Sequence, residues 1–138
     1  MSSQSTTINP KNVPVPQPQF SQINSIELKG PAKLIAITGQ LSLNLDGTPE
    51  VQGFEAQVKL ALRNLENCIE AAGATKRDIF KVTHHVVDFD FEKQNPAQIF
   101  VEWLGIDHRP ASAMLPAYKL AAPGLLYEIE TWLVVPGQ

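Results

Sequence analysis

The sequence predicts an α+β fold, a two-layer sandwich in which one mainly antiparallel sheet carries two helices on one face. This prediction depends on the order of the periodic stretches, which is strand, strand, short strand, helix, strand, helix, strand, strand. It also depends on length, because 138 residues fit a single domain with one core. No internal repeat is visible in this order.

The chain begins with a polar, proline-rich segment, residues 1–19, which we expect to be an arm before one domain over 20–138. This arm has no apolar stretch of the kind found in a secretory signal. Strands are expected at residues 25–28 and 33–38, on either side of a Gly-Pro turn. A third, short strand is expected at 40–45, where polar and apolar residues alternate.

The first helix is expected at residues 54–72, because apolar side chains recur there at spacings of three and four. Gly73 follows at the position of a C-terminal cap. The β-branched, apolar stretch 79–87 predicts the next strand. The apolar stripe of the helix consists of Phe54, Val58, Ala61, Leu62, Leu65, Ile69 and Ala72.

A second helix is expected to begin near Asn95, with Pro96 in its first turn, and to end before Gly105. The last two strands are expected at 113–117 and 126–135. With both helices on one face, the other face of the sheet needs its own cover. Candidates for that second face are Val86, Met114, Leu115, Ile129 and Leu133.

Composition excludes several classes of function. The net charge is -3 and no basic block occurs, so a nucleic-acid partner is not expected. No apolar run approaches the ~18 residues that span a bilayer, so no membrane insertion is expected. The single cysteine, Cys68, excludes an internal disulfide and suits a reducing compartment, which makes a cytoplasmic location the expectation.

The adjacent His84 and His85 do not predict a metal site. Neighbouring residues of a strand point to opposite faces, so the two rings cannot chelate one ion together. His108 is distant in sequence, and no Cys, His and carboxylate spacing resembles a zinc set. We therefore expect no metal and no cofactor, and either strand histidine remains a candidate for a general base or a structural side chain.

Several short motifs, in order, resemble those of the RidA/YjgF family. Each is weak alone, but together they cover about residues 20–136. The matching motifs are Ile37-Thr38-Gly39-Gln40, residues 57–64, Ala71-Ala72-Gly73, residues 78–82, the set Asp88, Phe91 and Asn95, Arg109-Pro110-Ala111, and Glu128-Ile129-Glu130.

The resemblance implies the family's fold, which is chorismate-mutase-like. It also implies a homotrimer with a small-molecule cleft at each of its three subunit interfaces. Many members of the family hydrolyse reactive 2-imino acids to 2-keto acids, so the resemblance implies chemistry at a C=N bond.

One position departs from the family's pattern. Deaminating members carry an arginine after Pro-Ala that binds the substrate carboxylate through two hydrogen bonds, and Ser112 occupies that position here. Loss of such a charged pair costs ~2–5 kcal/mol in a desolvated site. Arg109 is an alternative clamp, but three residues of strand separate the two by about 10 Å and put them on opposite faces unless the chain bends at Pro110.

Glu128 matches the family glutamate that activates water or transfers a proton, and it is the expected catalytic residue. Glu130 shares its strand face, and the alternative for both is an ion pair with a neighbouring strand. The expected substrate-binding residues are Phe20, Thr38, Gly39, Asn95, Arg109, Ser112, Ala113 and Met114. The departures from the family at Phe20, Ser112 and Met114 predict a less charged and more apolar site than a 2-imino-acid site.

Three functions remain open. The first is an enzyme of imine or enamine chemistry (hydrolysis, tautomerisation or cyclisation) in a specialised pathway, acting on a substrate without the usual carboxylate. The second is a non-catalytic trimer that binds a small ligand or acts as a chaperone. The third is an ordinary 2-iminobutanoate/2-iminopropanoate deaminase. An endoribonuclease activity, sometimes attached to the family, fits poorly with the acidic net charge.

Overall fold

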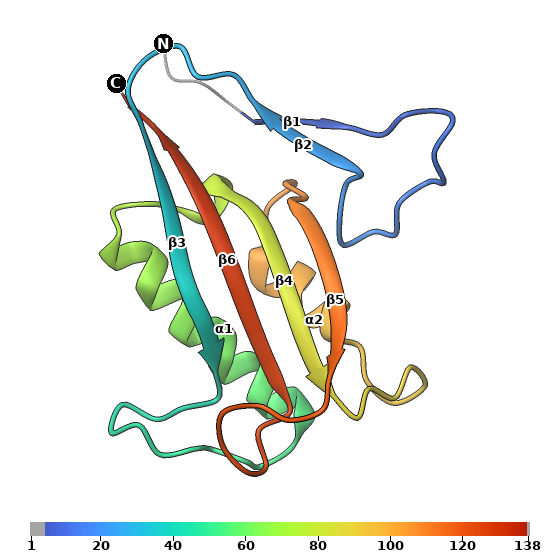
Figure 1. Ribbon diagram of the computed structural model, residues 1–138, viewed down its shortest axis with the longest axis vertical. Coiled ribbons are helices and arrows are strands. Elements are labelled where there is room, and N and C mark those ends of the chain that lie inside the picture. The colour runs from blue at the N-terminus through green and yellow to red at the C-terminus, as the bar shows by residue number, and fades with distance from the viewer. Residues whose placement is uncertain (1–4, 138) are drawn as a thin grey trace.

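One four-stranded sheet forms the centre of the protein, and two helices pack on one of its faces. In the computed structural model, which describes residues 5–137, these elements are β3 Ala32–Leu41, α1 Phe54–Ala71, β4 Ile79–Val87, α2 Pro96–Leu104, β5 Ala111–Ala117 and β6 Tyr127–Pro136. The strand order is β3-β6-β4-β5, and only the β4–β5 pair is parallel. Figure 1 shows the sheet with both helices behind it. The predicted α+β architecture with a mainly antiparallel sheet is confirmed.

The apolar stripe predicted for the first helix is the face of α1 that packs on the sheet. Its middle is fully buried, because residues three and four apart share one side of a helix. Gly73 adopts a positive φ of 75° just after the helix, as a C-terminal glycine does. The buried apolar residues of α1 are Val58, Ala61, Leu62, Leu65 and Ile69.

Gln57 joins α1 to the loop before β6. Its Nε2 donates to the Gly124 carbonyl at 2.9 Å, and its Oε1 accepts from the Leu126 N–H at 2.8 Å. The side chain is buried, and both ends of its amide are satisfied. Gln57 therefore fixes the chain just before β6 begins.

The caps of α2 agree with the sequence. Asn95 is the N-cap, and its side-chain oxygen accepts from the Gln98 N–H at 3.0 Å. Pro96 is the first helical residue, and Gly105 ends the helix in the left-handed region at φ 66°.

The N-terminal segment contains a strand that the sequence pattern did not predict. β1 Ser5–Ile8 pairs with β2 Ile23–Ile26 as an antiparallel hairpin, separate from the main sheet. The Asn24 side chain donates to the Phe80 carbonyl at 3.0 Å and so fastens the hairpin to the start of β4. Figure 1 shows the hairpin beyond the end of the sheet where β6 finishes.

The expectation of a separate strand at residues 40–45 was wrong. β3 runs on to Leu41, and its pairing with β6 shifts between Ile37 and Gln40. Such a shift marks a β-bulge, which lets one strand continue with a local kink. Thr38 and Gly39 lie inside this irregularity.

The residues proposed for the second face of the sheet were mostly misassigned. Val86, Ile129 and Leu133 are fully buried in the core beneath the helices, and Met114 packs against that core. Only Leu115 alternates to the other face, where it is exposed. Apolar composition alone could not assign faces, because the start of the alternation depends on strand register.

Candidate functional site

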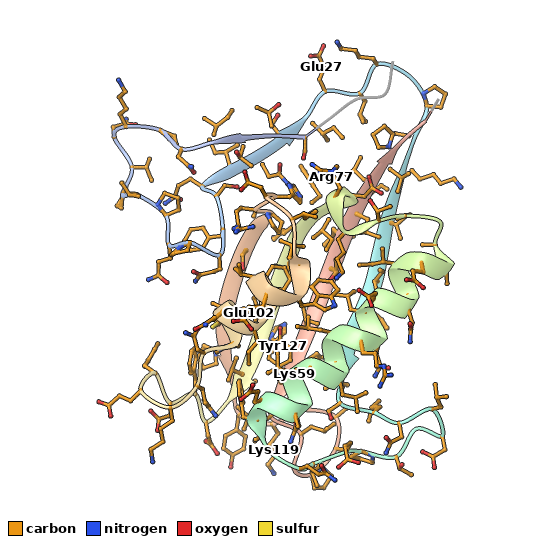
Figure 2. All side chains as sticks on the ribbon, turned by 180° about the vertical axis from the view of Figure 1, so that it is seen from behind. Glu27, Lys59, Arg77, Glu102, Lys119 and Tyr127 are labelled. Atoms are coloured by element: carbon orange, nitrogen blue, oxygen red, sulfur yellow. The ribbon has the colours of Figure 1, made fainter. Side chains whose placement is uncertain are left out.

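Two opposite faces of β6 carry different chemistry. Tyr127, Ile129, Thr131 and Leu133 point to the helices and are buried, so the alternate residues Glu128, Glu130 and Trp132 point away. We call this second side the open face of the sheet. Figure 2, seen from behind, shows Tyr127 between the sheet and the helices.

Glu128 lies over the bulge of β3. A Cβ atom built on Gly39 would lie 2.2 Å from Glu128 Oε1, so any larger residue would collide with the carboxylate. Gly39 has an ordinary φ, so this position needs glycine for space and not for backbone freedom. The structure therefore places Glu128 beside Gly39 and its exposed neighbour Thr38.

His85 and Glu130 form a pair on the same open face. The His85 Nε2 and Glu130 Oε1 atoms are 3.1 Å apart, and the side chains are 23% and 51% exposed. In the register of β4 and β6, His85 stands directly opposite Glu128. One imidazole and two carboxylates thus lie on neighbouring strands, and Glu130 is in contact with the side chain of the strand beside it.

His84 points the other way and has a structural environment. It is fully buried, with Nδ1 2.6 Å from the Tyr127 hydroxyl and its ring edge-on to Phe100. Burial, with a smaller contribution from the charge of His85, lowers the pKa of His84 to about 4. Burial likewise raises the pKa of Tyr127. Both groups are therefore neutral at physiological pH, and His84 does not reach the open face.

A second group of expected site residues lies at the other end of the sheet. The Arg109 guanidinium is engaged by backbone carbonyls: Nε donates to Pro18 at 2.8 Å, and Nη1 donates to Ile106 at 2.9 Å and His108 at 3.0 Å. The Ser21 hydroxyl donates to the Arg109 carbonyl at 2.6 Å. These bonds hold the loop that carries the half-buried Phe20 against the segment before β5.

Three expected ligand contacts lie on β5, the edge strand beside β4. Register puts Ser112 next to Val82 and Met114 next to His84, both in the row that faces the helices. Ala113 pairs with Thr83 and belongs to the open face. The three residues are thus divided between the two faces of the sheet.

One chain does not bring all the expected site residues together. Ser112 aligns with Val82, and Val82 with Thr131, three residues beyond Glu128. Three residues of strand and two strand spacings correspond to ~14 Å between the Ser112 and Glu128 backbones. The Asn95 side chain, the cap of α2, forms hydrogen bonds with Gln98 at the start of that helix.

The contact between His85 and Glu130 was not predicted from the sequence. Both residues were considered separately, but their contact depends on the register between β4 and β6, which the sequence pattern does not give. Among residues 5–137, no cluster of three or more His, Cys, Asp or Glu side chains could hold a metal ion. No helix in this same range is long and apolar enough to cross a membrane.

Comparison with solved structures identifies the class of fold to which this protein belongs. The fold is that of Rid proteins: a structure from Yersinia pestis, described as YyfB, a protein of unknown function of the conserved Rid family, superposes with a TM-score of 0.77. The two chains share 27% identity, over 94% of this chain and 98% of that one.

Sequence comparisons agree with the structural match. The family model described as Endoribonuclease L-PSP matches residues 11–135. A RutC family protein of Pyrococcus horikoshii is 30% identical over 87% of this chain and 90% of its own length. Another, from Aquifex aeolicus, is 32% identical over 59% of this chain, and the match spans 61% of that relative's length. The chain belongs to the RidA/YjgF family.

Proposed function

We propose that this protein acts on a small imine or enamine that carries no free carboxylate, with Glu128 as the acid–base residue. The observation that carries the proposal is the placement of Glu128 over Gly39, beside His85 on the open face. A carboxylate next to an open backbone position can accept a proton from water or from a substrate carbon, which is what hydrolysis, tautomerisation or cyclisation at C=N requires.

The engagement of Arg109 away from Glu128 supports a substrate without a carboxylate. Ser112 replaces the family arginine, and Arg109 uses its Nε and Nη1 atoms on three backbone carbonyls. Lys81, the cation that β4 places on the open face, is four residues from His85, or ~13 Å along the strand. A carboxylate bound near Glu128 would therefore face Glu128 and Glu130, and neither Arg109 nor Lys81 is placed to pair with it.

We propose further that the complete site forms between subunits of a homotrimer. The distance of ~14 Å between Ser112 and Glu128 supports this, because a second copy could bring one group of site residues to the other. Leu34, Leu115 and Trp132 are exposed on or beside the open face, and exposed apolar groups of this kind mark protein contacts. A cytoplasmic location is part of the proposal and is supported by the single cysteine.

The activity can be tested with imines generated in situ. A flavin-dependent amine oxidase supplies the imine of benzylamine, which has no carboxylate, and an L-amino-acid oxidase supplies a 2-imino acid from leucine. Semicarbazide reacts faster with the free imine than with the aldehyde or keto acid that hydrolysis produces, so an imine hydrolase lowers the initial rate of semicarbazone formation. We expect the native protein to lower this initial rate for the benzylamine imine and to change it little for the 2-imino acid.

Variants make the test specific. Glu128→Gln should lose the effect, whereas Glu55→Gln, the same change at an exposed position of α1, should keep it. Native protein that behaves like buffer with both imines would overturn the catalytic proposal and favour a ligand-binding role. Greater activity on the 2-imino acid would instead identify an ordinary deaminase.

Assembly can be tested separately by light scattering coupled to size-exclusion chromatography. The native protein should elute with the mass of three chains, and Trp132→Glu should reduce that mass because it puts a charge on the open face. Leu45→Glu is the matched control, since Leu45 is fully exposed in a loop. A native protein with the mass of one chain would contradict the trimer.

A further inference from the structure

The open face holds a second titratable group next to Glu128. His85 is the cross-strand partner of Glu128, and its Nε2 is 3.1 Å from Glu130 Oε1. Cross-strand partners have Cβ atoms ~4.5–5.5 Å apart, so the imidazole and the Glu128 carboxylate extend from adjacent points of the sheet. They can therefore flank a small planar molecule that lies on this face.

The contact with Glu130 sets which nitrogen of His85 is available. A carboxylate accepts from the Nε2–H and so holds the ring in one orientation and one tautomer. Among residues 5–137 no hydrogen bond of the His85 Nδ1 atom is found, so this atom is free to accept or donate a proton. The arrangement is that of a histidine oriented by an acid, in which the second ring nitrogen transfers the proton.

The adjacent His84 has no ring nitrogen exposed on the open face, in contrast to His85. His84 is sealed in the core, and its Nδ1 is bound to the Tyr127 hydroxyl. Among the histidine and glutamate side chains of β4 and β6, His85 and Glu130 share the face on which Glu128 lies over Gly39.

We propose that His85, positioned by Glu130, is a second proton-transfer residue and that the site interconverts imines and enamines by a 1,3-proton shift. This inference rests on the proposed function, since it takes Glu128 as the first proton-transfer group. It adds tautomerisation to the reactions of this site, because two proton-transfer groups on one face suit a 1,3-proton shift.

The step balances without a co-reactant. Glu128 takes a proton from the carbon next to the C=N carbon, and the electron pair of that C–H bond forms the C=C bond. The C=N π electrons move to nitrogen, which receives a proton from Nδ1 of protonated His85. Nothing is oxidised or reduced, and exchange with water restores the proton on His85 and removes the one on Glu128.

The test uses 2-methyl-1-pyrroline, a cyclic imine without a carboxylate, in deuterated water. Each passage through the enamine replaces a hydrogen next to the C=N carbon with deuterium, so proton NMR measures the rate of tautomerisation directly. Native protein should accelerate this exchange over buffer. His85→Gln should slow the protein-dependent rate by about 10²-fold, and Lys81→Gln, on the same face of β4, should leave it unchanged.

Two further variants separate positioning from folding. Glu130→Gln keeps an oxygen that accepts from Nε2 and should retain most of the exchange activity, whereas Glu130→Leu should lose it. Hydrolysis of the benzylamine imine, measured in parallel, should fall much less than exchange in both His85→Gln and Glu130→Leu. A variant that had only lost its fold would lose both activities together.

The outcomes distinguish the two proposals. If Glu128→Gln is inactive but His85→Gln exchanges as fast as the native protein, the role of His85 is overturned and the proposed function stands. If the native protein hydrolyses imines through Glu128 but does not accelerate exchange, the tautomerisation is overturned. If Glu128→Gln retains both activities, the proposed function itself fails.

Discussion

Lowering the pH should destabilise this protein through His84. The ring is fully buried against Tyr127 and Phe100, and its pKa falls from an ordinary 6.5 to about 4 because burial disfavours the charged form. Between these two values the unfolded chain binds a proton that the folded chain does not. The free energy of unfolding therefore rises with pH in this window and falls as the pH drops from about 6.5 toward about 4.

The size of the effect follows from the shift. A difference of about 2.5 pKa units is worth about 3 kcal/mol when integrated over the whole window, and about 2–3 kcal/mol of it is lost between pH 7 and pH 4.5. A loss of this size is a large part of the 5–15 kcal/mol, roughly, that stabilises a typical domain. Well below pH 4, where His84 is protonated in both states, the contribution should change no further.

Urea denaturation followed by circular dichroism, at one fixed protein concentration and several pH values, measures this dependence. His84→Val should be less stable than the native protein at pH 7, because Tyr127 loses its hydrogen-bond partner. Its stability should nevertheless change by about 2–3 kcal/mol less between pH 7 and pH 4.5. His85→Gln keeps the buried ring and should keep the native steepness. Equal slopes for the native protein and His84→Val would refute the argument.

Three other predictions concern contacts that position the site. Gly39→Ala should reduce imine turnover in the semicarbazide assay, because the added Cβ would displace the Glu128 carboxylate. Gly30→Ala, with no atom within 4 Å of the added Cβ, should keep native turnover, and equal activity of the two variants would contradict the steric argument. Gln57→Met should lower the free energy of unfolding by about 1–2 kcal/mol in urea melts, since the Gly124 carbonyl and the Leu126 N–H lose their partner. A change below measurement error would contradict this. Arg109→Met should speed proteolysis within the N-terminal hairpin, which loses a hydrogen bond to the domain, and unaltered cleavage there would count against that role.

Local signals in the sequence sufficed for the helices and for the class of fold. The stripe of α1, the Asn95 cap and the Gly105 terminator depend on residues within a few positions of one another, so pattern and propensity reveal them. The placement of Glu128 at the start of the last strand, and the order of the motifs that identify the RidA/YjgF family, also come from the sequence alone.

Contacts between distant segments could not be obtained in this way. The two faces of the sheet were misassigned at Val86, Ile129 and Leu133, because one residue of register moves every side chain to the opposite side. Only the tertiary structure places Gly39 under Glu128 and brings His85 into contact with Glu130. It also shows that Arg109 donates a hydrogen bond to the Pro18 carbonyl. Each of these contacts spans tens of residues along the chain, so it is set by strand pairing and packing rather than by local sequence.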